Sequence, residues 1–240
     1  MDILLFSSGR ANKQQKLLEY GKQELRRQIE ENKIKNYLLV PYAVIGFSFK
    51  QIQAYLEETL YPMGVKVLNI TEFNNPIDGI KAADAIAVSG GNTWYLNRCL
   101  HDYNLINCIR DAVLKNNKPY IGWSAGINIA APTILTTNDM PIINAIITPS
   151  LNLVPFQINP HYTDSFIDGH MGETRDERIV EFLYKNQFQT VVGLREGSWL
   201  KLLNNKLSYY SIKGETLKIF NFNKPVLEVD SGDNIDFLLK

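Results

Sequence analysis

Cysteine is scarce in this chain, which holds two cysteines, Cys99 and Cys108, among its 240 residues. The segment Asn97–Val113 around them is predicted to be helical, and at their separation along a helix a disulfide is geometrically awkward. We therefore expect both thiols to be reduced and buried.

An excess of charge of either sign is absent, because 25 lysines and arginines balance 25 aspartates and glutamates. No overall field steers the chain toward nucleic acid or an anionic membrane. We expect a small partner that is neutral or only locally charged, and neither nucleic acid nor a membrane.

A long hydrophobic run at the amino terminus is absent as well. The apolar run Ile3–Phe6 has no basic region before it, and it is too short for a signal peptide or a membrane span. The sequence predicts a cytoplasmic protein.

The chain does have ample material for a core, with 45% hydrophobic and 11% aromatic residues. It shows no linker, internal repeat or low-complexity segment. We predict one α/β domain that covers residues 1–240.

Short apolar runs alternate with helical patterns in the first half of the chain. The predicted buried strands are Ile3–Phe6, Tyr37–Val40, Val65–Ile70, Ala82–Ser89 and the run that ends at Tyr120 and Ile121. The predicted helices are Lys13–Asn32, a helix from the N-cap Ser48 to Leu60, and Leu105–Lys115. This alternation predicts a doubly wound, mostly parallel sheet with helices on both faces. Ligands of such sheets bind beyond the carboxyl ends of the strands.

The second half is less regular. It holds a possible strand at Leu151–Ile158, an amphipathic helix at Thr174–Lys185 and a buried strand at Thr190–Leu194. After Trp199 come short alternating segments at Leu200–Leu203, Lys206–Ile212, Leu217–Phe222 and Pro225–Val229. These segments predict antiparallel hairpins appended to the main sheet.

The segment Gly122–Gly126 fits the pattern G-x-S-x-G of a nucleophile elbow. It lies between the strand that ends at Ile121 and a predicted helix over Ala125–Ala131. A serine fits so sharp a turn only if its neighbours are small, and the two glycines and Ala125 meet that need. Ser124 is therefore the candidate nucleophile.

A serine hydroxyl needs a base, and the chain offers three histidines. His101 follows a cysteine on a predicted helix and is expected to be a solvated surface group. His170 lies in a glycine-rich loop, where a capping or exposed role is favoured. His161 follows a strand-like run and Asn159-Pro160, so it is expected on the same sheet edge as Ser124 and is the favoured base.

The carboxylate that orients the histidine has several candidates. Glu196 follows the strand Thr190–Leu194, and this position at a strand end favours it. Glu196 can equally well be interpreted as a surface turn residue that forms an ion pair. The other candidates are Asp139, Asp164 and Asp168.

A glycine pair, Gly90-Gly91, follows the predicted fourth strand. Ala125, the residue after the nucleophile, can donate one N–H to a developing oxyanion, and the second donor must come from a loop whose backbone approaches closely. Gly91 is the candidate. A tight turn before a helix that begins near Asn92 explains the pair equally well.

Taken together, five segments resemble the dipeptidase E (alpha-aspartyl dipeptidase) family of serine peptidases. They are Ser89–Trp94, Gly122–Asn128, Asn159–Asp164, Gly172–Arg178 and Gly193–Gly197. The resemblance covers about Ile3 to Trp199, and the chain departs from it at Trp94, where relatives more often have phenylalanine.

The resemblance implies a flavodoxin-like fold similar to class I glutamine amidotransferases, with serine in place of cysteine at the elbow. It implies a Ser124-His161-Glu196 triad and hydrolysis of dipeptides and some short peptides with an amino-terminal aspartate (Asp-Xaa). No cofactor and no metal are expected, and the chain is expected to be a monomer or a small homo-oligomer. A cyanophycinase-like exopeptidase and a non-catalytic flavodoxin-like binding module remain as alternatives.

The resemblance also bears on Arg175. Thr174 and Glu177 form a predicted capping box, which places Arg175 at the first helical position. A guanidinium there can hold a carboxylate through two hydrogen bonds. The family motif places an arginine at this spot and favours substrate binding over a solvated helix end, with Arg178 as the second choice.

Overall fold

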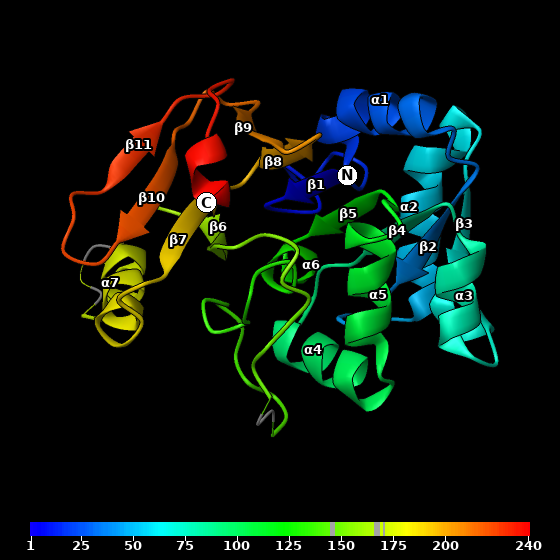
Figure 1. Cartoon of the computed structure of the whole chain (residues 1–240), viewed down its shortest axis with the longest axis horizontal. Helices are drawn as coiled ribbons and strands as arrows, with labels where there is room; N and C mark the ends of the chain where they lie inside the picture. Colours follow the sequence, from blue (N-terminus) through cyan, green and yellow to red (C-terminus); the bar gives the residue numbers. More distant parts are fainter. Residues whose placement is uncertain (145–146, 166–168, 170) are drawn as a thin grey trace.

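The computed structural model describes residues 1–144, 147–165, 169 and 171–240. Its strands form two sheets (Figure 1). The larger sheet has the order β3-β2-β4-β5-β1-β8-β9, and the smaller has the order β11-β10-β7-β6.

The strands of the larger sheet are β1 Asp2–Phe6, β2 Asn36–Val40, β3 Lys66–Asn69, β4 Ala85–Val88, β5 Tyr120–Trp123, β8 Ser198–Leu203 and β9 Lys206–Ser211. Those of the smaller sheet are β6 Gln157–Tyr162, β7 Thr190–Arg195, β10 Leu217–Asn221 and β11 Leu227–Val229. The α-helices are α1 Lys22–Asn32, α2 Phe49–Leu60, α3 Pro76–Ala82, α4 Thr93–Asp102, α5 Leu105–Leu114, α6 Ala125–Asn128 and α7 Arg175–Lys185. Short 3₁₀ helices are η1 Glu19–Gly21, η2 Tyr61–Met63, η3 Ile70–Glu72 and η4 Asp236–Leu239.

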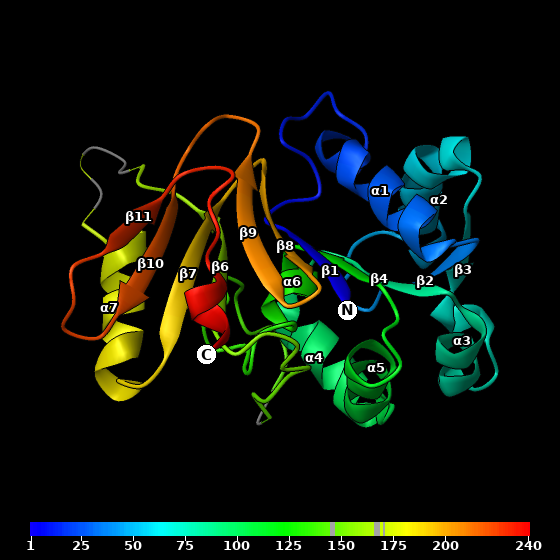
Figure 2. The same ribbon diagram turned by 45° about the horizontal axis from the view of Figure 1, so that its top comes forward.

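The larger sheet is parallel from β3 to β1, and β8 and β9 extend it as an antiparallel hairpin. Helices α1 and α2 cover one face, and α3, α4 and α5 lie on the other (Figure 2). The predicted α/β fold with a mostly parallel sheet is therefore confirmed. No helix within the described ranges combines the length and the apolar content needed to cross a membrane.

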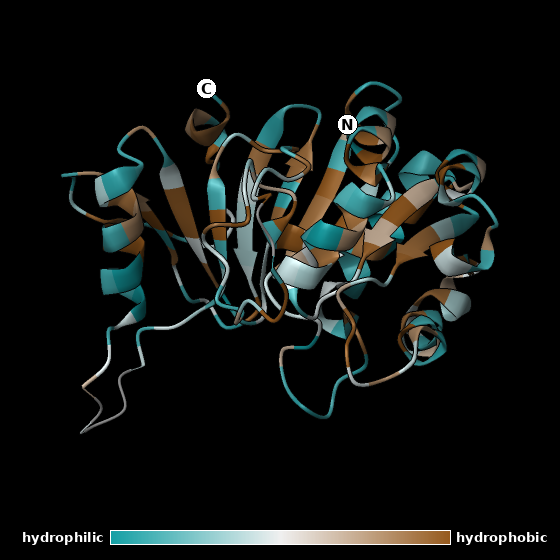
Figure 3. Cartoon of the chain, turned by 90° about the horizontal axis from the view of Figure 1, so that it is seen from below, coloured by the Kyte–Doolittle hydropathy of each residue, from teal (hydrophilic) through white to brown (hydrophobic). Residues whose placement is uncertain are grey.

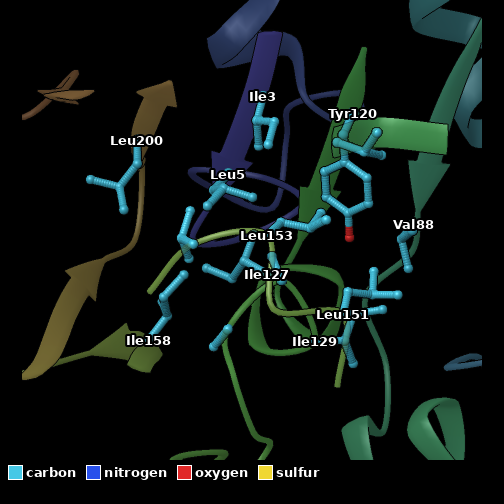
Figure 4. Packing of buried hydrophobic residues seen from close by; sticks show 14 of the residues in the cluster. Ile3, Leu5, Val88, Tyr120, Ile127, Ile129, Leu151, Leu153, Ile158 and Leu200 are labelled. Carbon is cyan, nitrogen blue, oxygen red and sulfur yellow. The ribbon is translucent and has the colours of Figure 1, made fainter. Parts of the chain in front are cut away.

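Alternating residues of β1 point to opposite faces of the sheet, as the geometry of a strand requires. Leu4 and Phe6 pack in the cluster beneath α1 and α2, whereas Ile3 and Leu5 pack in the cluster on the other face. Figure 4 shows Ile3 and Leu5 beside Tyr120 and Leu153 in that second cluster. Hydrophobic residues accordingly concentrate in the strands, while the helices carry hydrophilic residues as well (Figure 3).

The smaller sheet shows that the prediction of hairpins appended to the main sheet was wrong in part. The expected strand at Thr190–Leu194 and two of the expected hairpin segments exist, but they pair with β6 and with each other rather than with the main sheet. Helix α7 packs on this sheet through Ile179 and Leu183, which contact Tyr162 and Phe220.

The expected strand at Leu151–Ile158 was also misplaced, because the strand begins at Gln157. Leu151 and Leu153 are buried, but their N–H groups donate to the carbonyls of Ile129 and Ala130 after α6. An apolar run thus fills the core without pairing in a sheet. The helix expected over Ala125–Ala131 is similarly short, since α6 ends at Asn128.

The single helix expected over Asn97–Val113 is in fact two helices. Asn104 has a left-handed backbone (φ 56°) and separates α4 from α5, a conformation that asparagine tolerates better than most residues. Both cysteines are free thiols, but only Cys99 is buried and Cys108 is half-buried.

The starts of α1 and β4 also differ from the prediction. Helix α1 begins at Lys22 rather than Lys13, because Leu18 has a left-handed backbone. Helix α3 was not predicted, and it takes up Ala82, so β4 begins only at Ala85.

Candidate active site

Ser124 lies in a strained turn between β5 and α6, with φ 53° and ψ −114°. The turn closes only because Gly122 and Gly126, two residues to either side of Ser124, lack side chains. A Cβ atom on Gly122 would lie 2.6 Å from the carbonyl oxygen of Gly126, and one on Gly126 would lie 2.3 Å from that of Val88. The local sequence therefore dictates the elbow geometry.

The structure brings together the three residues proposed as a triad. His161 Nε2 lies 2.8 Å from Ser124 Oγ, and His161 Nδ1 lies 3.0 Å from Glu196 Oε1. A carboxylate can only accept a hydrogen bond, so Nδ1 carries the proton and Nε2 is left to accept the serine hydroxyl. The His161 and Glu196 side chains are 37% and 52% exposed, so the site is open to solvent.

A bulge in β6 sets the position of His161. The pairing of β6 with β7 shifts register between Pro160 and Tyr162, and His161 between them has φ 53°. The sequence predicts His161 at a strand end, and the structure places it at this bulge, one residue before the end of β6. Glu196 directly follows β7, so His161 and Glu196 lie at adjacent strand ends of the smaller sheet.

The other histidine and carboxylate candidates are engaged elsewhere or lie outside the described residues. His101 Nε2 lies 2.9 Å from the carbonyl oxygen of Pro149, and Asp139 accepts the N–H of Thr93 at 2.7 Å. Asp164 forms ion pairs with Arg195 and Lys218. His170 and Asp168 are outside the residues that the structure describes.

Gly90 lies against Ser124, and Gly91 lies against Ala43. A Cβ atom on Gly90 would lie 3.0 Å from Ser124 Cβ, and one on Gly91, at φ 139°, would lie 2.0 Å from the carbonyl oxygen of Ala43. Neither the Gly91 nor the Ala125 N–H donates to another residue that the structure describes. Ala125 is the first residue of α6, so its N–H has no acceptor within the helix.

Arg175 is the first residue of α7, and the predicted capping box is present, with Thr174 as N-cap and Glu177 completing it. The Arg175 guanidinium donates to Asn138 Oδ1. Burial lowers the pKa of Arg175, and the positive charge of Arg178 adds to this effect. Both effects disfavour an isolated cation, so an anion bound here would be stabilised.

Asn138 is a residue that the sequence did not reveal. Its amide nitrogen donates to the carbonyl oxygen of Pro160 at 2.6 Å, and Asn159 Nδ2 donates to Asn138 Oδ1 at 2.7 Å. Arg175 is thereby connected to the main chain directly before His161. Asn138 lies in an irregular loop without periodicity, and nothing in the sequence pattern distinguished it.

Two polar cavities open beside these residues. One, of about 400 Å³, is lined by His161 and Glu196 together with Lys213 and Glu215. The other, of about 230 Å³, is lined by Asn138, Asn159 and Arg178 among others. Arg178 itself forms an ion pair with Glu173 at 3.5 Å.

The chain is similar to proteins named as peptidases over nearly its whole length. The model of Peptidase family S51 matches residues 3–210. Peptidase E of a Nostoc species is 40% identical over 237 residues, which cover 99% of this chain and 96% of that protein. Peptidase E of Haemophilus influenzae is 38% identical over 203 residues, which cover 85% of this chain and 92% of that protein.

Solved structures share the fold. A peptidase from an acI-B1 Actinobacterium matches with a TM-score of 0.69 at 16% identity and covers 98% of this chain and 96% of its own. A putative peptidase E protein from Listeria monocytogenes matches with a TM-score of 0.66 at 21% identity, over 88% of this chain and 98% of its own. The family match and the near-complete coverage by its relatives establish that the chain belongs to peptidase family S51.

Proposed function

We propose that the chain is a serine peptidase in which Ser124, His161 and Glu196 act as a catalytic triad. Membership of family S51 makes peptide hydrolysis the reaction class. The observation that carries the serine mechanism is the continuous chain of contacts from Ser124 Oγ through the imidazole to Glu196, with both distances at hydrogen-bond length.

In the first half of the reaction, Ser124 Oγ attacks the carbonyl carbon of the scissile peptide bond while His161 Nε2 takes the hydroxyl proton. The Gly91 and Ala125 N–H groups donate to the oxyanion that forms. The resulting imidazolium is stabilised by Glu196 and returns its proton to the leaving amine, and an acyl-enzyme remains.

In the second half, a water molecule attacks the acyl ester with His161 again taking a proton. The proton then passes to Ser124 Oγ, which releases the acid product and restores the enzyme. The solvent-exposed imidazole lets water reach the base without a conformational change.

The proposed substrates are dipeptides and short peptides with an amino-terminal aspartate. Arg175 is the proposed ligand of the aspartate side chain, because it is partly buried and its guanidinium donates to the neutral amide of Asn138. A planar cation at a helix N-terminus suits a carboxylate on both counts.

The test combines activity and labelling. Wild-type protein is expected to hydrolyse Asp-Leu in preference to Leu-Leu, with and without a chelator, and a fluorophosphonate is expected to label Ser124. Ser124→Ala should lose labelling and turnover, typically by a factor on the order of 10⁶. Retention of more than about one per cent of activity by purified Ser124→Ala would exclude the serine mechanism.

The same assay separates the remaining alternatives. A cyanophycinase-like enzyme would cleave the branched Asp-Arg polymer in preference to Asp-Leu. A non-catalytic binding module would leave the fluorophosphonate unreacted, because only an activated serine is labelled.

A further inference from the structure

Ser7 lies where the two sheets meet. It follows β1 directly and is fully buried. Its hydroxyl donates to the carbonyl oxygen of Leu194 at 2.6 Å and accepts the main-chain N–H of His161 at 3.0 Å. Leu194 belongs to β7 and is two residues before Glu196, so one hydroxyl contacts the strands that carry both the base and its carboxylate.

The main chain of β1 also holds the nucleophile. The Ser124 N–H donates to the carbonyl oxygen of Phe6 at 3.2 Å, and the Ser7 N–H donates to the carbonyl oxygen of Ser198 at 3.0 Å. Two adjacent residues therefore hold both groups by hydrogen bonds. Phe6 accepts the N–H of Ser124, directly after β5 of the larger sheet, and Ser7 accepts the N–H of His161 in the smaller sheet.

The bulge at His161 makes this contact consequential. His161 interrupts the regular register of β6 with β7, and its N–H is paired with a side chain rather than with a neighbouring strand. Asn128 also links α6 to β6, but it donates to Ile158, three residues before the base. Among these links, that of Ser7 is the one that ends on His161 itself.

We propose that Ser7 is a positioning residue that holds the His161 imidazole at hydrogen-bond distance from Ser124. The proposal rests on the proposed function, since it requires His161 to be the base. Ser7 takes no part in bond making. It acts by fixing the backbone from which the imidazole projects, and a base displaced by about 1 Å can lower a rate on the order of 10²-fold.

The decisive variant is Ser7→Ala, which leaves the His161 N–H and the Leu194 carbonyl unpaired. We expect kcat for Asp-Leu to fall by about 10- to 100-fold with KM changed less than about threefold, because the residues proposed to bind the aspartate are untouched. The rate of fluorophosphonate labelling should fall with kcat, since labelling also needs the base. Ser7→Cys, which keeps a weak donor and acceptor, should lie between Ser7→Ala and the wild type.

Thr59→Val is the matched control. The Thr59 hydroxyl is likewise buried and donates to a main-chain carbonyl, that of Leu17 at 2.5 Å, but it lies on α2. Thermal unfolding compares the stabilities of all variants, and activity is assayed at a temperature at which each variant is folded. Thr59→Val is expected to lose stability without loss of kcat.

Wild-type kcat and labelling rate in folded Ser7→Ala would overturn the proposal and leave the triad intact. Equal losses of kcat in Ser7→Ala and Thr59→Val would overturn it too, because any buried hydroxyl would then have the same effect. If Ser7→Ala does not fold, Ser7→Cys takes its place and is compared with the wild type and with Thr59→Val in the same way. Wild-type protein that the fluorophosphonate does not label would instead refute the proposed function.

Discussion

Arg175, at the start of α7, is hydrogen-bonded to Asn138 in the loop before β6, with the guanidinium donating to the amide oxygen. The same asparagine donates to the carbonyl oxygen of Pro160, the residue before His161. Asn138 thus links the proposed specificity residue to the main chain next to the proposed base.

Arg175→Met is expected to reduce kcat/KM for Asp-Leu about thirtyfold more than for Asn-Leu. Only the aspartate loses a charge-assisted contact, which contributes about 2 kcal/mol. Arg178→Met is the control, because Arg178 lies on the same helix but is paired with Glu173. Loss by the same factor for both substrates would make Arg175 a structural residue.

Glu196→Gln is expected to lower kcat by roughly 10²- to 10⁴-fold while the fold is retained. An amide cannot stabilise the imidazolium that forms on His161, and it can hold the ring in the wrong tautomer. Asp164→Asn is the comparison variant, expected to change kcat by less than about threefold, since Asp164 contacts Arg195 and Lys218 rather than the base. The reverse order of losses in steady-state assays would move the third triad position to Asp164.

The Asp164 carboxyl also predicts a pH dependence of stability. Burial on its own raises the pKa of Asp164, but hydrogen bonds from Lys218, Arg195 and Tyr162 outweigh it and hold the pKa at about 2, below the ordinary 3.8. A carboxyl with a lowered pKa stabilises the fold above its unfolded pKa, and this contribution is lost as the pH falls through the folded value.

Asp164→Asn should therefore be less stable than the wild type at neutral pH, and the difference should fade between pH 4 and pH 2. Since the carboxylate is about half exposed, we expect about 1 kcal/mol or less in the free energy of unfolding. Urea titrations of both proteins over this pH range measure it. A difference that stays constant with pH would show that the ion pairs contribute nothing.

Gly91→Ala is expected to lower kcat while Gly64→Ala, at another positive φ, lowers stability alone. A Cβ atom on Gly91 would overlap the carbonyl oxygen of Ala43, whereas one on Gly64 meets no atom within 4 Å. The Gly91 backbone must shift, and with it the proposed oxyanion donor, at a typical cost on the order of 10²-fold in kcat. Equal kcat values in the two variants would remove Gly91 from the proposed mechanism.

The sequence predicted features that a few adjacent residues determine. The elbow at Ser124 follows from small neighbours, and the N-cap at Ser48 and the capping box at Thr174 follow from spacing along one helix. The parallel strands of the first half were recognisable because each contains a short apolar run, which is typical of strands in a sheet covered on both faces.

Features that depend on distant partners were not predictable in this way. Alternation along Leu217–Phe222 indicates a strand but not its neighbour, so the division into two sheets was missed. The bulge at His161 is defined by its pairing with β7, and the contacts of Asn138 join a loop to α7 and β6. The single domain, the roles of the triad and the absence of a metal stay predictions.

The separation of the proposed triad between two sheets has a consequence for biosynthesis. A ribosome releases the chain from its amino terminus, so Ser124 leaves the exit tunnel before His161 and well before Glu196. The parallel strands of the larger sheet, β1 to β5, precede β6, which carries the base. Under the proposed mechanism, a nascent chain that has folded those strands displays Ser124 without its base, and we expect it to be inert toward peptides until translation has supplied β6 and β7.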